Sequence, residues 1–411
     1  MKHFFKVKTV EEVLAVISSF QALGVEDVPL VEARARVLAE PATSGEDIPQ
    51  FDRSTMDGFA VRAKDTFGAT EGLPALFNVI GEVQMGTRTG LETGPGQTAR
   101  VWTGGMIPKG ADSVVMVEHA RPVDERTVEL AKAVAPYDNV IRVGEDVRKG
   151  QTLLSAGHRL RAQDVGLLAA LGHNSLRAYK IPRVAIISTG DEIVPTETKP
   201  KIGQVRDINS YSLGAQVEDV HATPVYLGLI KDNLEELKQA VGKGLEQADS
   251  VILSGGSSVG VRDYTVDTFT SFPRSEILVH GVSVSPGKPT ILSKLGNKSL
   301  WGLPGHAVSA MITFDLFLRP LLETLSGEIK EKPRFGSRLP AVLSRNVPSV
   351  HGREDYIRVR IQLEPDGRIT AHPVLGKSGL ISTMVKADGL VRIGLNEEGL
   401  VEGSEVTVLL F

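Results

Sequence analysis

Apolar residues recur at helical spacing in several parts of this 411-residue chain. Near the N-terminus they fall at Val10, Val13 and Ile17, and Thr9 with Glu12 forms a capping box at the start of the predicted helix. A hydroxyl at the cap and a carboxylate three residues later each satisfy a backbone N–H that the first helical turn leaves free. Four further stretches predict helices: 162–172, 209–220, 232–247 and 307–325.

Other stretches are continuous apolar runs typical of buried strands. They occupy 182–188, 224–230 and 249–256, and they alternate with the predicted helices. This alternation predicts an α/β domain with a mainly parallel sheet over about 178–327. Asp232 is a plausible cap for the helix that follows the second run.

Two regions predict antiparallel β-structure instead. Between about 48 and 150, short apolar runs alternate with Gly/Pro turns. In the tail, 356–363 alternates apolar and polar residues and is followed by a Pro365-Asp366-Gly367 turn signal. We therefore expect a β-rich domain in the first half and a small C-terminal β-barrel over about 328–411.

Composition narrows the possible functions. The chain is 41% hydrophobic and 23% charged, with a net charge of −4, and no Lys/Arg-rich stripe predicts nucleic-acid binding. It has no cysteine, which excludes disulfides, thiolate nucleophiles and iron–sulfur clusters. Charged residues interrupt the N-terminus and the apolar stretch 307–325. We therefore expect no export signal and no membrane span, and a cytoplasmic protein.

Polar residues follow two of the predicted buried strands. Asp191 and Glu192 come after Ser188-Thr189-Gly190, and ligands in open α/β sheets bind beyond the carboxyl ends of strands. Paired carboxylates there suit Mg²⁺, which prefers oxygen ligands and shares them with phosphate. An ordinary loop that caps the next element is the alternative.

The second such segment runs from Ser254 to Asp263. Its glycines allow successive backbone N–H groups to converge on an anion, and its serines add hydroxyl donors. Asp263 is a candidate ligand for a metal, together with Asp191 and Glu192, and a flexible Gly/Ser loop is the alternative. The candidate anion-binding residues are Gly255, Gly256, Ser257 and Ser258.

Three more motifs are weaker when taken one at a time. The prolines of Ser285-Pro-Gly-Lys-Pro289 stiffen a turn that presents Lys288, a point charge suited to phosphate, although a solvated turn explains it equally. Pro304 and Gly305 precede a long helix whose first N–H groups attract anions, or they simply begin that helix. Polar residues around Asp57 suggest a site, but a structural turn explains them as well.

The order of these motifs along the chain closely resembles the molybdopterin molybdenumtransferase family, that is, bacterial MoeA and the gephyrin E domain. The segments that carry the resemblance are 54–61 (STMDGFAV), 101–116 (VWTGGMIPKGADSVVM), 143–147 (VGEDV), 188–193 (STGDEI), 254–265 (SGGSSVGVRDYT), 285–289 (SPGKP), 302–309 (GLPGHAVS) and 377–389 (KSGLISTMVKADG).

The resemblance implies a multidomain α/β and β protein that forms an elongated homodimer. Its active-site cleft would be completed by the partner's β-rich domain. The expected domains are a linking domain built from 1–45 and 149–177, a β-rich insertion over 46–148, a MogA-like α/β domain over 178–327 and a C-terminal β-barrel over 328–411.

The resemblance also implies roles for individual residues. Positions matching the family's acidic and catalytic residues are Asp57, Thr103, Asp146, Glu192 and Asp263, with Asp232 at another acidic position. Positions matching its substrate- and phosphate-binding residues are Lys288, Pro304, Arg353 and Ser378. We expect Asp57, Glu192 and Asp263 to line one cleft near Ser257 and Lys288.

The implied reaction joins molybdate to adenylated molybdopterin with release of AMP, with Mg²⁺ as cofactor. Expected partners are a MogA-type adenylating protein and molybdoenzyme acceptors or their chaperones. Two departures affect the oxyanion site: Ser285 stands where many members carry a second lysine, and His306-Ala307 replaces Asn-Pro. The alternatives are a MogA-type adenylyltransferase and a non-catalytic scaffold or regulator.

Overall fold

The computed structural model describes residues 7–255, 259–329 and 338–411, with the backbone alone over 259–263. The chain divides into two compact units. The smaller unit comprises 41–155 and 166–173, and the larger unit comprises the remaining residues. Helix α2 (Ala162–Ala170) runs from one into the other, and Gly172 follows it in the left-handed region with a φ of 80°.

The smaller unit is built around a six-stranded sheet in its described residues, as its alternating runs predicted. The strand order is β7-β4-β6-β5-β9-β8, and every pairing except β5 with β6 is antiparallel. Short pairs β3–β10 and β2–β11 adjoin this sheet in the sequence. The strand bounds are β2 Ala42–Thr43, β3 Arg53–Ser54, β4 Gly58–Val61, β5 Ala75–Glu82, β6 Gln97–Val101, β7 Ser113–Met116, β8 Ala120–Pro122, β9 Thr127–Leu130, β10 Val140–Ile141 and β11 Thr152–Leu154.

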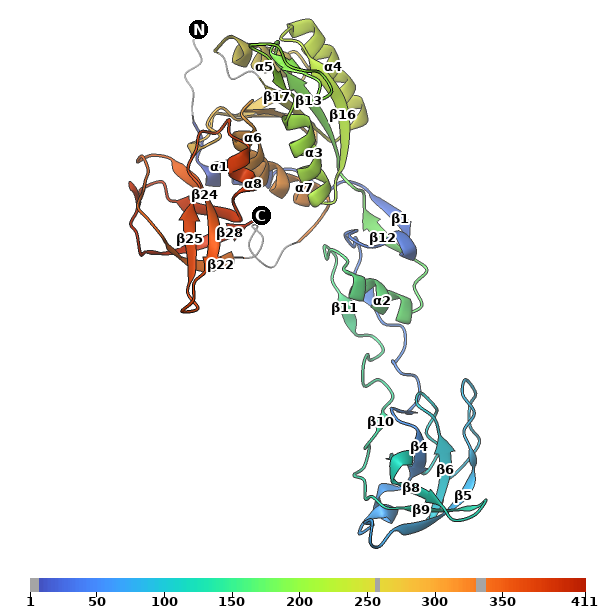
Figure 1. The fold of residues 1–411 in the computed structure, drawn as a ribbon. Helices are drawn as coiled ribbons and strands as arrows, with labels where there is room; N and C mark the ends of the chain where they lie inside the picture. The colour runs from blue at the N-terminus through green and yellow to red at the C-terminus, as the bar shows by residue number, and fades with distance from the viewer. Residues whose placement is uncertain (1–6, 256–258, 330–337) are drawn as a thin grey trace. The chain divides into compact units, whose positions relative to one another are not determined.

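The larger unit contains the predicted α/β sheet (Figure 1). Its described strands follow the order β16-β13-β17-β21-β20-β18; the first four are mutually parallel, whereas β20 is antiparallel to both neighbours. The prediction of a mainly parallel sheet is confirmed. The strand bounds are β13 Arg183–Thr189, β16 Thr223–Ile230, β17 Ser250–Gly255, β18 Glu276–His280, β20 Ile291–Leu295 and β21 Lys298–Leu303.

Both faces of this sheet are covered, which explains the continuous apolar runs of its central strands. Val184 and Ile186 pack with α3, whereas Ala185 and Ile187 point to the opposite face and pack with α4. The helices are α1 Val10–Ile17, α3 Asn209–Asp219, α4 Leu234–Gln247, α5 Val259–Thr270, α6 Ala307–Thr313 and α7 Arg319–Leu325, with a π-helical turn over Phe314–Leu318 between the last two.

The helix caps test two predictions. Thr9 and Glu12 form the expected capping box at α1, with the Glu12 N–H donating to Thr9 Oγ1 at 3.2 Å. The assignment of Asp232 as the cap of α4 was wrong. Asn233 is the cap, because its side-chain oxygen accepts from the backbone N–H groups of Glu235 and Glu236.

The C-terminal strands close into a five-stranded barrel, as predicted. The order is β24-β25-β22-β28-β26, and β26 pairs back with β24 to complete the circle. A sixth strand, β19 (Val284–Ser285), joins the barrel from the α/β region by pairing with β24. The barrel bounds are β22 Arg338–Leu343, β24 Glu354–Leu363, β25 Ile369–Pro373, β26 Gly389–Ile393 and β28 Glu405–Leu410.

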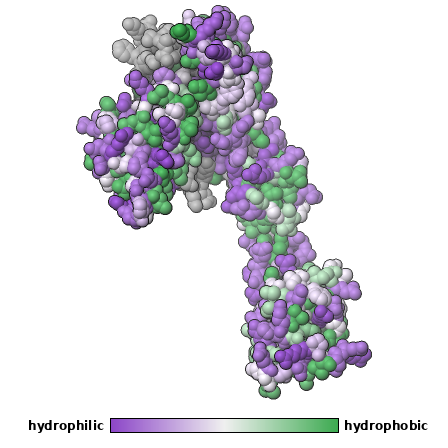
Figure 2. Space-filling view, in the orientation of Figure 1, coloured by the Kyte–Doolittle hydropathy of each residue, from purple (hydrophilic) through white to green (hydrophobic). Residues whose placement is uncertain are grey.

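Two other segments of the larger unit that are distant in sequence pair with each other. Strand β1 (Val25–Pro29) is antiparallel to β12 (Ser175–Tyr179). The four domain bounds given above remain a prediction. Hydrophilic residues dominate the face shown in Figure 2, with hydrophobic residues among them. Within the described ranges, none of the helices combines the length and the hydropathy needed to cross a lipid bilayer.

Candidate functional site

The carboxyl ends of β13 and β17 lie side by side, with Thr189 paired to Gly255. Gly255 has a φ of 151°, and a Cβ at this position would lie 1.9 Å from the carbonyl oxygen of Thr189. Gly190, also at a φ of 151°, would place a Cβ 2.9 Å from Glu192 Oε2. Gly255 therefore requires glycine because a Cβ would collide with the backbone of the neighbouring strand end, whereas at Gly190 the positive φ is what disfavours any side chain.

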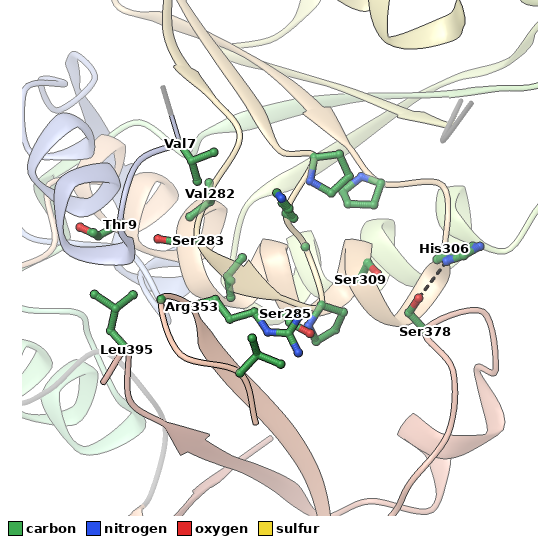
Figure 3. A pocket seen from close by; sticks show the side chains of 18 of the residues that line it. Val7, Thr9, Val282, Ser283, Ser285, His306, Ser309, Arg353, Ser378 and Leu395 are labelled. Atoms are coloured by element: carbon green, nitrogen blue, oxygen red, sulfur yellow. Dashed lines mark hydrogen bonds between the residues drawn. The ribbon is translucent and has the colours of Figure 1, made fainter. Parts of the chain in front are cut away.

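The larger of two neighbouring pockets, of about 880 Å³, lies where the Ser285–Pro289 turn meets the barrel (Figure 3). It brings together four residues that the resemblance implied for substrate binding: Lys288, Pro304, Arg353 and Ser378. Further hydroxyls come from Ser283, Ser285 and Ser309. The larger pocket thus combines two cationic side chains with several hydroxyl groups.

The backbone of the barrel fixes one wall of the larger pocket. Ser285 on β19 pairs in parallel with Asp355 on β24. Asp355 is buried and lies 3.2 Å from the guanidinium Nε of Arg353. It also accepts a hydrogen bond of 2.5 Å from Ser349 Oγ. Arg353 is therefore oriented by a carboxylate that balances part of its charge, while 42% of its side-chain surface stays exposed.

The smaller pocket, of about 320 Å³, lies at the strand ends. It is lined by three residues that the sequence singled out, Glu192, Gly255 and Gly305. His306 lines both pockets, so the two adjoin at this residue. Of the candidate anion-binding residues, Gly255 therefore lines the smaller pocket, whereas Lys288 and Arg353 line the larger one.

His306 also connects the α/β region to a loop of the barrel. Its Nδ1 lies 2.8 Å from Ser378 Oγ (Figure 3). The N–H of Val308 donates to the Ser378 carbonyl at 3.2 Å. The two contacts hold Ser378 against the start of α6. The sequence singled out both residues but gave no sign that they meet.

Two residues of the smaller pocket were missed by the sequence argument. Asn209 donates through Nδ2 to Ser254 Oγ at 2.8 Å and to the Gly305 carbonyl at 2.9 Å, and so ties the end of β17 to the turn before α6. Asp207 accepts from Ser188 Oγ at 3.0 Å and from the Ser210 N–H at 3.1 Å. Their only signal in the sequence was a pair of polar residues at the start of a predicted helix, a pattern shared by ordinary helix starts.

Asp232 also lies at a strand end. Its Oδ1 accepts a hydrogen bond of 2.7 Å from Thr189 Oγ1, the last residue of β13. Since Asn233 caps α4, the side chain of Asp232 is held by the strand end and not by the helix.

The smaller unit brings Asp57 and Thr103 together. Asp57 Oδ1 accepts from both the backbone N–H and the hydroxyl of Thr103, each at 2.7 Å. The backbone bond and then the hydroxyl bond hold the pKa of Asp57 below its ordinary value. Asp146 is exposed, and its N–H donates to the Ile48 carbonyl.

The metal prediction rests partly outside the described residues. Gly256, Ser257 and Ser258 lie outside them, and the side chain of Asp263 is not described. Asp191 and Glu192 are exposed, and within the described ranges no three His, Cys, Asp or Glu residues cluster to hold an ion. Mg²⁺ bound mainly by substrate phosphates needs only one or two carboxylates, which Glu192 fits.

Family models match most of the chain. The MoeA N-terminal region (domain I and II) matches residues 8–172, a probable molybdopterin binding domain matches 185–324, and the MoeA C-terminal region (domain IV) matches 340–411.

Full-length relatives agree with these matches. A molybdopterin molybdenumtransferase of Bacillus subtilis is 33% identical, over 98% of this chain and 93% of its own length. A molybdopterin molybdenumtransferase of a Nostoc species is 34% identical, over 93% of this chain and 88% of its own length. A solved molybdopterin biosynthesis MoeA protein of Pyrococcus horikoshii is 36% identical with a TM-score of 0.81, covering 98% of this chain and 99% of its own. Sequence motifs, fold and relatives coincide over the whole chain, and the protein belongs to the MoeA family.

Proposed function

We propose that this protein is a molybdopterin molybdenumtransferase, which transfers molybdenum from molybdate to adenylated molybdopterin and releases AMP. The observation that carries the proposal is the junction of two pockets at His306. One pocket offers cations and hydroxyls, and the other offers a glycine-lined strand end beside a carboxylate. The names of the full-length relatives support the same reaction.

The larger pocket suits molybdate, a tetrahedral dianion. Lys288 supplies a mobile point charge and Arg353 an oriented guanidinium, while the hydroxyl of Ser378 donates a hydrogen bond to an oxyanion. Hydrogen bonds to a charged acceptor are roughly twice as strong as neutral ones. Lys288 would therefore bind the oxyanion, whereas its motif alone suggested a phosphate.

The smaller pocket suits the phosphate end of the adenylated substrate. Backbone N–H groups near Gly255 would approach the phosphates closely because no Cβ intervenes. Glu192 would hold Mg²⁺ there, and the ion would offset phosphate charge as AMP departs. The protein would then act mainly by positioning two anions close together and by offsetting their charge.

The β-rich unit and the barrel favour this reaction over adenylation by a MogA-type protein. A protein of that type would need only the α/β domain, whereas here the barrel contributes Arg353 and Ser378 to the larger pocket. A scaffold would not need this set of ligand-facing groups. A homodimer, a cytoplasmic location and transfer of the product to molybdoenzymes follow from the family resemblance and are part of the proposal.

The test is AMP release by the purified chain from adenylated molybdopterin, measured with and without molybdate. We expect release that requires molybdate and is stimulated by Mg²⁺. Formation of adenylated molybdopterin from ATP would instead support the MogA-type function, and tight substrate binding without either reaction would support a scaffold or regulator.

A further inference from the structure

The main chain on both sides of Arg353 is anchored at the wall of the larger pocket. The N–H of Gly352 donates to the Leu395 carbonyl at 2.9 Å, and the N–H of Glu354 donates to the Ser283 carbonyl at 2.9 Å. Both acceptor residues line the larger pocket. The backbone of Arg353 therefore has a fixed position, whereas its long side chain loses many rotamers if it is to point in one direction.

Asp355 sets the direction of that side chain. Its residue is 4% exposed, and Arg353 donates to its Oδ2 from both Nε and Nη2 at 3.3 Å. The backbone of Asp355 is held between two strands, because it pairs with Ser285 of β19 and with Ile393 of β26. Ser349 Oγ donates to the same carboxylate at 2.5 Å. The guanidinium is thus hydrogen-bonded to a buried carboxylate whose own position is fixed.

The edge of the guanidinium that Asp355 occupies determines which edge is left for a ligand. The carboxylate takes the edge formed by Nε and Nη2 of Arg353. None of the residues that the structure describes forms a hydrogen bond with Nη1. The remaining edge carries two parallel N–H donors, one from each Nη, which suit two oxygens of a tetrahedral oxyanion. In Figure 3 the guanidinium end of Arg353 points toward Ser285, which lines the same pocket.

We propose that Asp355 is the positioning residue of the oxyanion site: it holds the Nε–Nη2 edge of Arg353 so that the opposite edge meets two oxygens of molybdate. This inference rests on the proposed function, which assigns molybdate to the larger pocket. A carboxylate that only offset the charge of Arg353 would have the opposite effect on binding. Its removal would then strengthen the attraction for an anion, whereas loss of a positioning group weakens binding.

The experiment is calorimetric titration of the full chain with molybdate alone. Asp355→Asn keeps the size of the side chain, and we expect the affinity for molybdate to fall about tenfold although a negative charge is removed. Asp366→Asn is the matched control, because Asp366 forms an ion pair of 2.6 Å with Arg368 on the exposed surface of the same barrel. Neither residue of that pair is among the described residues that line the larger pocket. The control removes the same charge and should bind molybdate as the wild type does.

A double-mutant cycle separates positioning of Arg353 from a general effect on structure. Arg353→Met removes the guanidinium and should itself weaken molybdate binding about tenfold. Since Asp355 acts through Arg353, adding Asp355→Asn to Arg353→Met should cause no further loss of affinity. Ser349→Ala leaves the carboxylate but removes one hydrogen bond to it, and should weaken binding about two- to fivefold. It keeps the test valid if thermal unfolding shows that the Asp355 variant does not fold.

Several outcomes would overturn the proposal. They are equal or tighter molybdate binding by Asp355→Asn, a further loss of affinity when this change is added to Arg353→Met, and unchanged affinity in Ser349→Ala. Molybdate-dependent AMP release by the wild type, together with wild-type affinity in Asp355→Asn, would overturn this inference alone. The expected pattern of molybdate affinities without any AMP release would contradict the proposed function alone.

Discussion

Asp57 Oδ1 lies 2.7 Å from both the backbone nitrogen and the hydroxyl of Thr103, and it accepts a hydrogen bond from each. The two residues come from segments that are 46 positions apart, and both were singled out by the family resemblance. Their contact shows that the family motifs around Asp57 and Thr103 describe one local structure. Its backbone bond, and then its hydroxyl bond, lower the pKa of the Asp57 carboxyl.

Thr103→Val should raise the pKa of Asp57 towards its ordinary value, because the hydroxyl bond is lost while the backbone bond remains. Thr103→Ser keeps a hydroxyl and should leave the pKa low. The measurement is an NMR titration of the Asp57 carboxyl carbon in all three proteins. A lowered pKa stabilises the folded state above the unfolded-state pKa, and that stabilisation is lost as pH falls through the folded value. Identical titration curves in Val and Ser variants would contradict the role of the hydroxyl.

Gly255→Ala should damage both stability and activity. The new Cβ would collide with the Thr189 carbonyl, and the φ of 151° disfavours any side chain. We expect a loss of about 1–3 kcal/mol in the free energy of unfolding together with loss of AMP release. Gly242→Ala, within helix α4 and without a close contact, should be neutral or slightly stabilising. Equal behaviour of the two variants in urea unfolding would contradict this account.

Asn233→Ala should cost about 0.5–2 kcal/mol in the free energy of unfolding, because the α4 cap is lost, and should largely spare catalysis. Asp232→Asn should have little effect on the helix, since Asp232 contacts Thr189 instead. Comparison of chemical unfolding and AMP release in the two variants checks both statements. A larger loss of stability in the Asp232 variant would indicate that Asp232, and not Asn233, caps α4.

Lys288→Met keeps an unbranched apolar stem but removes the charge from the larger pocket. We expect molybdate affinity to fall about tenfold, with little change in thermal stability because Lys288 is exposed. Lys243→Met, on the exposed surface of α4, is the matched control and should bind as the wild type. Unchanged molybdate affinity in the Lys288 variant would show that molybdate binds outside this pocket.

The fold was largely predictable because its signals are local. Continuous apolar runs marked the buried strands, and the alternation at 356–363 marked a barrel strand. For α4, the sequence predicted Asp232 as the cap, one residue before the observed cap Asn233. Asp232 and Asn233 are both good caps, and only the tertiary bond from Thr189 separates their roles.

The sequence singled out candidate residues but gave no sign that some of them line one of two neighbouring pockets. Lys288, Arg353 and Ser378 are distant in sequence, and their meeting depends on the pairing of β19 with β24. That pairing carries no local signal, because β19 is only two residues long. The contact of His306 with Ser378 could not be predicted from the sequence either, because it joins the α/β region to a barrel loop.

The most direct test of the proposed function is the stoichiometry of a single turnover. The full-length protein loaded with adenylated molybdopterin is mixed with molybdate and Mg²⁺. The AMP released is then compared with the molybdenum that shows Mo–S bonds by X-ray absorption. The account predicts that the two appear together in equal amounts and that neither appears without molybdate. AMP release without formation of Mo–S bonds would contradict it.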